Sequence, residues 1–277
     1  MNQLEKVSFA DSNTAFYVNS GEHRGKHLAK IGGISQPAVT GFWRRAVRQW
    51  KPTILLDIGV NYGEIIFSTT YPDHALIIGI EANPQLAPII EKSRQEHPNR
   101  GQIRMIYALA SDCETEGQNF YVDKYWSGTS SAVPNVNQHL FEVHKVNSIK
   151  VDSLFLNRPL ADERLLFKID VEGYEGHALA GMSRLVSECG SVLGNIEFNN
   201  SFLEKAGVRI EEFFAFLNVH FHVYIHTKGD SFITLNRLNM QSLQSFFKRE
   251  DIDTHLLLAS KNEDVRQLGF HITPVDL

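Results

Sequence analysis

The sequence has little cysteine and little imbalance of charge. Only Cys113 and Cys189 occur among 277 residues. Two thiols exclude a disulfide framework and a cysteine-rich zinc site, and they fit a reducing cytoplasm. The formal net charge is −5 and the sequence pI is about 6.2. Because a nucleic-acid-binding domain normally carries a basic footprint, we expect no nucleic-acid partner.

Long apolar runs are also missing. No stretch approaches the roughly 20 residues that cross a bilayer. Residues 1–13 lack the basic and then apolar pattern of a secretory signal. We therefore expect a cytoplasmic protein without a membrane span. The hydrophobic fraction of 43% and the charged fraction of 21% are typical of a globular chain. Nothing in the pattern indicates an oligomeric state.

From residue 53 onward, short β-rich runs alternate with helical segments. The runs that predict strands are 53–60, 75–84, 102–111, 164–170, 191–198, 221–227 and 254–260. Apolar strands that alternate with helices are typical of a parallel sheet with helices on both faces. The sequence thus predicts an α/β fold, in which ligands bind beyond the carboxyl ends of the strands.

Two segments fall outside this alternation. Residues 1–52 are interpreted as an N-terminal extension that precedes a domain over 53–277. Within it, the Gly-rich and basic residues 19–33 predict a mobile loop, which could close over the site or bind an anionic part of the acceptor. A plain basic surface is the alternative. Residues 37–50 predict a helix that begins at Pro37. Residues 112–147 show no regular pattern and predict an irregular insertion, which we expect to shape a ligand pocket.

The insertion contains "KYWSGTSSAVPN" at residues 124–135. Tyr125 and Trp126 could form aromatic walls, and the hydroxyls of Ser127, Thr129 and Ser130 could bind a polar ligand. An ordinary solvated loop with one packed Trp is the alternative reading.

The first predicted strand runs into "DIGVNYGE", residues 57–64. Gly59 and Gly63 allow a tight turn and close approach of a ligand to the backbone. The spacing is not the GxGxxG of a dinucleotide site, which argues against a nicotinamide-dependent enzyme. Glu81 ends the next strand, where a carboxylate can accept both hydroxyls of a ribose. Helix capping or a surface ion pair is the alternative for Asp57 and Glu81.

Four blocks together resemble the FkbM family of S-adenosylmethionine-dependent methyltransferases. They are "LLDIGVNYGE", "IIGIEANP", "IKVDSLF" and "LLFKIDVEGYEGHALAGM", in this order between residues 53 and 200. The resemblance implies a class I methyltransferase, Rossmann-like fold with a seven-stranded, mostly parallel sheet whose last strand is antiparallel. It also implies that the cofactor lies against the following residues: Asp57, Gly59, Asn61 and Gly63 at its methionine and ribose part, Glu81 and Asn83 at the ribose, and Ser111 and Asp112 at the adenine.

Acidic residues gather where the fourth and fifth predicted strands end. Asp170 ends the fourth strand beside the expected donor methyl, and Glu197 and Asn199 end the fifth on one face. An oxygen-rich set of this kind fits Mg²⁺, with Asp170, Glu197 and Asn199 as ligands. Alternatively no metal binds, and Glu197 orients the substrate or caps a helix. As a catalytic group we expect Asp170 first, then Glu172 and Glu197.

Two neighbours of Asp170 have structural explanations. Glu175 falls in the first turn of the next helix, where a negative side chain is favoured, so we assign it to that helix. Lys168 shares a face with Asp170 and is expected to pair with a carboxylate.

An alcohol needs a general base or a cation to become a nucleophile at neutral pH. The acidic strand ends therefore favour an O-methyltransferase acting on a hydroxyl of a small molecule or glycan, such as a sugar or polyketide. An N-methyltransferase is the alternative, although "IDVEGYE" stands where such enzymes often have an "NPPY"-like motif. A protein that binds adenosylmethionine without catalysis is a further alternative.

Overall fold

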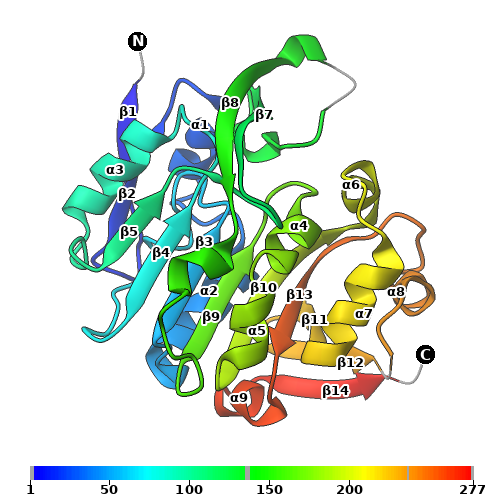
Figure 1. The fold of residues 1–277 in the computed structure, drawn as a ribbon. Helices are drawn as coiled ribbons and strands as arrows, with labels where there is room; N and C mark the ends of the chain where they lie inside the picture. Colours follow the sequence, from blue (N-terminus) through cyan, green and yellow to red (C-terminus); the bar gives the residue numbers. More distant parts are fainter. Residues whose placement is uncertain (1–2, 135–137, 236, 276–277) are drawn as a thin grey trace.

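The computed structural model describes residues 3–134, 138–235 and 237–275. Its centre is a nine-stranded sheet (Figure 1). In order across the sheet, the strands are β14 (His271–Val275), β12 (Ser231–Leu235), β11 (His222–Lys228), β13 (Asp253–Ala259), β10 (Ser191–Asn199), β9 (Arg164–Ile169), β3 (Ile54–Ile58), β4 (Leu76–Ile80) and β5 (Ile103–Ile106).

All seven predicted strands form, and they form a class I methyltransferase sheet. β5, β4, β3, β9 and β10 pair in parallel, and β13 is inserted antiparallel between β10 and β11. The expected count of seven is nevertheless too low, because β12 and β14 extend the sheet beyond β11. β14 contains Pro274, which lacks a donor N–H and argues against a strand except at a sheet edge. The edge is where β14 lies.

Helices cover both faces of the sheet, as the sequence predicts. One face packs against α4 (Glu175–Ala180), α5 (Ser183–Glu188), α6 (Asn200–Lys205), α7 (Ile210–His220) and α8 (Met240–Phe247). The other packs against α1 (His23–Lys30), α2 (Pro37–Arg45), α3 (Ala87–Glu96) and α9 (Asn262–Gln267). In the part of the chain that the structure describes, no helix is long and apolar enough to cross a membrane.

Alternation along the strands decides which side chains reach the site. In β3, Leu56 and Ile58 belong to the core on one face, and Leu55 belongs to the core on the other. Asp57 is on the same face as Leu55 because side chains alternate along a strand. In β9, Lys168 is on the face of Leu166 for the same reason. On this second face, an apolar core therefore ends in charged residues toward the carboxyl ends of the strands.

The N-terminal extension is more ordered than its composition predicts. β1 (Leu4–Ser8) and β2 (Ala15–Asn19) form a hairpin, and the expected loop over 19–33 contains α1. Its N-cap is Glu22, whose carboxylate accepts the Gly25 N–H at 2.8 Å. Glu is not among the strongly preferred N-cap residues, so the helix start gives little sequence signal. The helix expected at Pro37 is confirmed: α2 continues as a π-helix over Ala46–Trp50.

The insertion is also regular where a loop was expected. β7 (Thr115–Asp123) and β8 (Phe141–Ile149) pair antiparallel and form a small sheet with β6 (Leu109–Ala110). In Figure 1, β7 and β8 lie above the main sheet. Residues 135–137 of the insertion lie outside the described residues. Phe120 and Val122 of β7 and Val146 of β8 form a small core with Leu109. The other positions of the two strands are mostly polar, so the apolar alternation that predicts a strand is weak.

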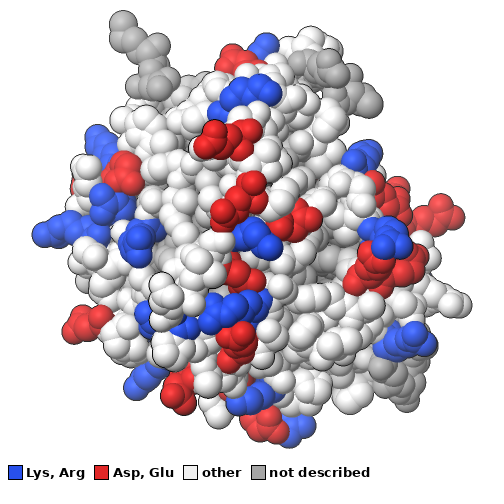
Figure 2. Space-filling view, viewed as in Figure 1, with Lys and Arg blue, Asp and Glu red and all other residues white. Residues whose placement is uncertain are grey.

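Acidic and basic side chains are interspersed over the face drawn in Figure 2. This mixture agrees with the small formal net charge of −5. Scattered opposite charges give no strong field of one sign for attracting a polyanion.

His97, which follows α3, is buried as a neutral imidazole. Its Nδ1 accepts the Asn99 N–H at 3.1 Å, and its Nε2 lies 3.1 Å from the Thr69 carbonyl oxygen. Nδ1 must therefore be unprotonated, while Nε2 carries the proton. Burial lowers the pKa of His97 from 6.5 to about 4. The folded state therefore binds a proton less readily at this site than the unfolded chain.

Acidification from pH 6.5 to 4 should therefore destabilise the protein through His97. In this window the unfolded chain takes up a proton that the folded state resists. The free energy of unfolding therefore decreases as the pH decreases, and His97 accounts for roughly 2–3 kcal/mol of that decrease. His97→Gln should flatten that part of the pH dependence, measured by urea unfolding at several pH values. His74→Gln, at an exposed position, is the control and should follow the wild type. Parallel curves for wild type and His97→Gln would contradict this prediction.

Candidate functional site

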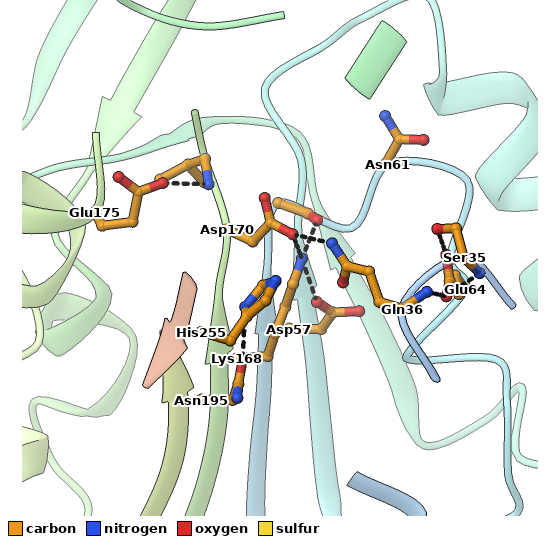
Figure 3. Close-up of polar contacts among 12 residues, drawn as sticks. Ser35, Gln36, Asp57, Asn61, Glu64, Lys168, Asp170, Glu175, Asn195 and His255 are labelled. Atoms are coloured by element: carbon orange, nitrogen blue, oxygen red, sulfur yellow. Dashed lines mark hydrogen bonds and ion pairs between the residues drawn. The ribbon is translucent and has the colours of Figure 1, made fainter. Parts of the chain in front are cut away.

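The candidate site is a cavity at the carboxyl ends of β3, β4 and β9 (Figure 3). The N-terminal extension and the insertion complete its walls. Its lining includes Arg24 and Gln36 from the extension, Gly59, Asn61 and Glu64 after β3, Glu81 and Ala82 after β4, Ala108–Ala110, Trp126–Gly128 from the insertion, and Lys168, Asp170 and Glu172 around the end of β9. This cavity therefore lies at the carboxyl ends of the strands, and its use as the ligand site stays a prediction.

The loop after β3 requires its two glycines. Gly59 has φ of +80°, and a Cβ there would overlap the backbone carbonyl oxygen of Asp170. Gly63 has φ of +97°, and a Cβ would overlap the ring of Phe67. Both positions combine a left-handed backbone with a close neighbour, which only glycine accepts without strain. Both glycines are thus required by the turn. Gly59 also lines the cavity, whereas Gly63 is not among the lining residues.

Glu81 holds this loop in place. One of its carboxylate oxygens accepts the Asn61 N–H and the other accepts the Asn83 N–H, each at 2.7 Å. Burial raises the pKa of Glu81. Glu81 and Asn61 line the cavity, and a carboxylate with two accepted bonds still has lone pairs for further donors. Asn83 is buried behind them, and its side chain accepts the Gln85 N–H at 3.0 Å.

Asp57 lies beneath the cavity and is not among its lining residues. Its Oδ2 accepts the Ile66 N–H at 3.2 Å. Burial raises the pKa of Asp57 to about 6, against the opposing charge of Lys168. Among the described residues, its Oδ1 has no hydrogen-bond partner and lies 3.6 Å from Lys168 Nζ. Asp57 therefore stabilises the loop after β3 through its hydrogen bond from the Ile66 N–H.

Lys168 links the two buried aspartates, as expected from its place in β9. Its Nζ donates a hydrogen bond to the Gly59 carbonyl at 2.7 Å and lies 3.6 Å from both Asp57 Oδ1 and Asp170 Oδ2. Burial by itself lowers the pKa of Lys168, but the charges of Asp170 and Asp57 outweigh it and raise the pKa. Its ammonium therefore stays charged.

Asp170 is held as an anion. Burial by itself raises its pKa, but the charge of Lys168, together with His255 and a hydrogen bond from Gln36, brings the pKa below its usual value. Gln36 Nε2 donates to Asp170 Oδ2 at 2.9 Å. Gln36 immediately precedes α2 and carries no sequence signal of a role at the site, because its contact depends on how the extension packs against β9.

Asp170, Glu172 and Glu197 form a carboxylate cluster. One oxygen from each lies within 4.8 Å of the others. Burial, and then the charge of Asp170, raises the pKa values of Glu172 and Glu197 well above their usual range. Glu197 Oε2 is buried and has no hydrogen-bond partner in the described chain. The three predicted catalytic residues are thus brought together.

Of the predicted metal set of Asp170, Glu197 and Asn199, the structure brings the two carboxylates together. Asn199 is the N-cap of α6, and its side chain accepts the Phe202 N–H at 3.1 Å. The strand pattern correctly placed Asn199 on the face of Glu197, but a helix begins directly after β10 and engages the amide. Glu172 completes the cluster in its place, from a left-handed turn with φ of +54°.

His255 is a residue of this region that sequence analysis missed. It lies on β13 opposite Glu197 on β10. Its Nδ1 is 3.0 Å from Asn195 Oδ1, an arrangement in which the ring N–H donates to the amide oxygen. Burial lowers the pKa of His255. Its place depends on the insertion of β13 beside β10, which no local pattern reveals.

Glu175 belongs to the strand-to-helix junction, as its position predicts. Its carboxylate accepts the N–H groups of Val171 at 2.8 Å and Gly173 at 3.0 Å. Burial raises its pKa to about 7. Glu175 thereby fixes the turn that carries Glu172, without lining the cavity.

Ser111 and Asp112, expected at the adenine, are not among the cavity-lining residues. Ser111 is buried and donates a hydrogen bond to Asp112 Oδ1 at 3.1 Å. Asp112 lies 3.3 Å from His177 Nδ1, at a different hollow of the surface. The residues just before them form the wall instead, at Ala108–Ala110.

The N-terminal extension and the insertion meet over the cavity through Glu22. Its Oε1 accepts the Ser127 N–H at 2.6 Å, and its Oε2 accepts the Tyr62 hydroxyl at 2.9 Å. Trp126 and Ser127 line the cavity, whereas Tyr125 is 54% exposed. The half-buried carboxylate of Glu22 therefore joins the extension, the glycine loop and the insertion.

The chain matches one protein family. The sequence model of the methyltransferase FkbM domain matches residues 57–231. No curated protein matches the chain. Among solved structures it is similar to a methyltransferase FkbM from Methylobacillus flagellatus KT, with 13% identity and a TM-score of 0.43, over 75% of this chain and 43% of that one. The chain therefore spans less than half of that protein.

Two further solved structures are similar at the same level. They are a putative O-methyltransferase from Klebsiella pneumoniae (11% identity, TM-score 0.44, 82% of this chain and 80% of that one) and an O-methyltransferase from Bacillus cereus in complex with SAH (11% identity, TM-score 0.44, 84% and 88%). At these values we take no site or substrate assignment from any of the three.

Proposed function

We propose, from the premise that the chain belongs to the FkbM methyltransferase family, that it uses S-adenosylmethionine to methylate a hydroxyl of a small molecule or glycan. The observation that carries the proposal is the carboxylate cluster of Asp170, Glu172 and Glu197 at the strand ends. The substrate is of the sugar or polyketide type in chemical character, with a hydroxyl presented to these carboxylates.

The residues that line the cavity fit the parts of the cofactor. Ile80, Ala82, Ala108–Ala110 and Phe120 are mostly apolar and suit an adenine ring. The carboxylate of Glu81 suits the ribose hydroxyls. The polar side chain of Asn61 suits the amino-acid part. The bound cofactor supplies an electrophilic methyl group, and the protein aligns the acceptor and removes its proton.

A hydroxyl acceptor fits the cluster better than an amine does. A carboxylate accepts a hydrogen bond from a neutral hydroxyl and draws its proton away as the new bond forms. The same negative charges would stabilise an amine as its ammonium ion, which has no lone pair for methyl transfer. Three carboxylates within 4.8 Å of one another therefore favour O-methylation.

We assign different roles to the three carboxylates from their pKa shifts. Asp170, with a lowered pKa, is a weak base and orients the acceptor while it stabilises positive charge near the donor sulfur. Glu172 and Glu197, with raised pKa values, are stronger bases. One of them receives the acceptor proton, because a raised pKa makes a carboxylate the stronger base.

The proposal is tested by incubating the protein with methyl-labelled S-adenosylmethionine and fractionated metabolites and glycans of its host. A labelled product is expected, heavier than the acceptor by one CH₂, about 14 daltons, plus the mass of the isotope label. Fragmentation that places the label on oxygen supports the proposal. A label on nitrogen supports N-methylation instead. Cofactor binding without transfer to any fraction supports a non-catalytic binding protein.

A divalent cation is a second candidate for the chemistry at the cluster. Asp170, Glu172 and Glu197 would hold it, since carboxylate oxygens are suitable ligands for Mg²⁺. A bound cation would lower the pKa of the acceptor hydroxyl. This candidate predicts that EDTA reduces transfer at least tenfold and that Mg²⁺ restores it. Full activity in EDTA, with the protein extensively dialysed, would eliminate the metal and leave the carboxylates alone.

A further inference from the structure

Arg24 reaches the cavity from outside the part of the chain that matches the family. It lies on α1 in the N-terminal extension, whereas the match begins at residue 57. Its side chain is 15% exposed and lines the same cavity as Gly59, Asn61 and Asp170. The ring of Trp126 lies beside the guanidinium, with 5.7 Å between the guanidinium carbon and the ring centroid. The extension therefore places a cation in the wall of the donor site.

Among the described residues, the hydrogen bonds and the ion pair of the guanidinium are all long. Nε donates to Asn61 Oδ1 at 3.3 Å, and Nη2 donates to Ser35 Oγ at 3.4 Å. The nearest carboxylate oxygen, Glu64 Oε2, is 3.7 Å from Nη2. A guanidinium has five N–H donors, and its strong bonds to carboxylates are nearer 2.8 Å. Much of its donor capacity therefore remains for a ligand.

Glu64 does not depend on Arg24, because it has closer donors. Its Oε1 accepts the backbone N–H groups of Ser35 and Gln36, each at 2.7 Å, and its Oε2 accepts the Ser35 hydroxyl at 2.5 Å. These bonds stabilise the Glu64 carboxylate and fix the chain that leads into α2. Arg24 is thus positioned beside a carboxylate that is already satisfied.

Charge in the cavity identifies what Arg24 binds. Of the described residues that line it, Arg24 and Lys168 are the basic ones. Lys168 is engaged by the Gly59 carbonyl, Asp57 and Asp170. The amino-acid part of the cofactor carries an ammonium and a carboxylate beside the sulfonium. The acidic residues of the cavity suit its positive groups, and Arg24 suits its negative one.

We propose that Arg24 binds the α-carboxylate of the methionine part of S-adenosylmethionine, so that the N-terminal extension completes the donor site. This inference rests on the cofactor occupying the cavity as proposed above. The hydrogen bonds of Glu22 hold Arg24 in place, since Glu22 caps α1 through the Gly25 N–H and also binds the insertion at Ser127. A planar guanidinium matches a carboxylate in two parallel hydrogen bonds.

Two ligands distinguish a contact of Arg24 with the α-carboxylate from a general effect of Arg24 on the shape of the cavity. S-adenosylhomocysteine carries the α-carboxylate, whereas 5′-methylthioadenosine has the same nucleoside and thioether but no amino-acid part. By isothermal titration calorimetry, Arg24→Ala should bind S-adenosylhomocysteine about 10–100-fold more weakly, as expected for loss of a charged hydrogen-bonded pair. Its affinity for 5′-methylthioadenosine should stay within about threefold of the wild type.

Matched variants complete the experiment. Arg24→Lys keeps the positive charge but lacks the planar group that donates two parallel hydrogen bonds. Its loss of S-adenosylhomocysteine affinity should therefore be smaller than that of Arg24→Ala. Lys26→Ala, at an exposed position of the same helix, should leave both affinities unchanged. Melting temperatures without ligand should be equal for all variants, which shows that α1 remains folded.

Three results would overturn the inference. Equal weakening of both ligands by Arg24→Ala would mean that Arg24 only supports the cavity. Unchanged S-adenosylhomocysteine affinity would mean that the carboxylate binds elsewhere, while the donor site itself stands. If the wild type binds neither ligand, the cavity is not the donor site, and the proposed function fails together with the inference.

Discussion

Replacing Asp170 with Asn should reduce the rate of methyl transfer by about 10²- to 10⁴-fold. The substitution keeps the size of the side chain and lets the amide contact Gln36, but it removes the charge that Lys168 and Gln36 stabilise. The acceptor would lose its orienting anion at the end of β9. The affinity for S-adenosylhomocysteine should stay within about threefold, because the carboxylate acts on the acceptor side. Initial rates with labelled cofactor and calorimetric affinities measure the two effects.

Asp73→Asn is the matched control, at an exposed position remote from the strand ends. It should have wild-type rates and affinities. If Asp170→Asn weakens cofactor binding as much as it slows transfer, Asp170 is a cofactor ligand and its assignment to the acceptor is wrong. A wild-type rate would remove Asp170 from the mechanism.

The substitution Gly59→Ala should destabilise the folded protein by about 4 kcal/mol or more. The backbone of Gly59 has φ of +80°, which strains any side chain, and the added Cβ would overlap the Asp170 carbonyl oxygen. That oxygen belongs to the neighbouring strand end, so relief of the overlap must separate β3 from β9 at the site. Urea unfolding followed by circular dichroism measures the loss.

Gly101→Ala provides the comparison, because a Cβ at Gly101 would have open space around it. Its stability should lie within about 0.5 kcal/mol of the wild type. A Gly59→Ala protein as stable as Gly101→Ala would show that the backbone at residue 59 can relax at little cost. The large expected loss also makes Gly59 unsuitable for testing cofactor contacts, a purpose for which Arg24 is better suited.

The central sheet could be predicted because its signal is local. Runs such as 53–60 and 164–170 are apolar on both faces, and helices follow them at regular intervals. The elements that were missed lack this signal. β7 and β8 are mostly polar apart from the small core that contains Phe120, Val122 and Val146, and β14 contains a proline that an edge strand tolerates. The helix α1 begins at an uncommon N-cap residue, Glu22.

The candidate site was predictable where it depends on strand ends. Asp170, Glu172 and Glu197 lie together because the parallel strands β9 and β10 end at the same edge of the sheet. Asn199 was placed on the correct face, but the cap of α6 was not foreseen. Gln36, Arg24 and His255 arrive from segments distant in sequence, and their contacts depend on tertiary packing that no spacing encodes.

The place of β13 between β10 and β11 also has a consequence for the order of folding. β11 and β12 connect to the rest of the sheet through β13, which pairs with β10 over residues 253–259. During synthesis, the sheet can close on this side only after residue 259 has left the ribosome. Until then the unpaired edge of β10 is exposed, and long-range pairings of this kind form late. We expect the nascent chain to expose this edge to chaperones, and His255 to join the site among the last residues.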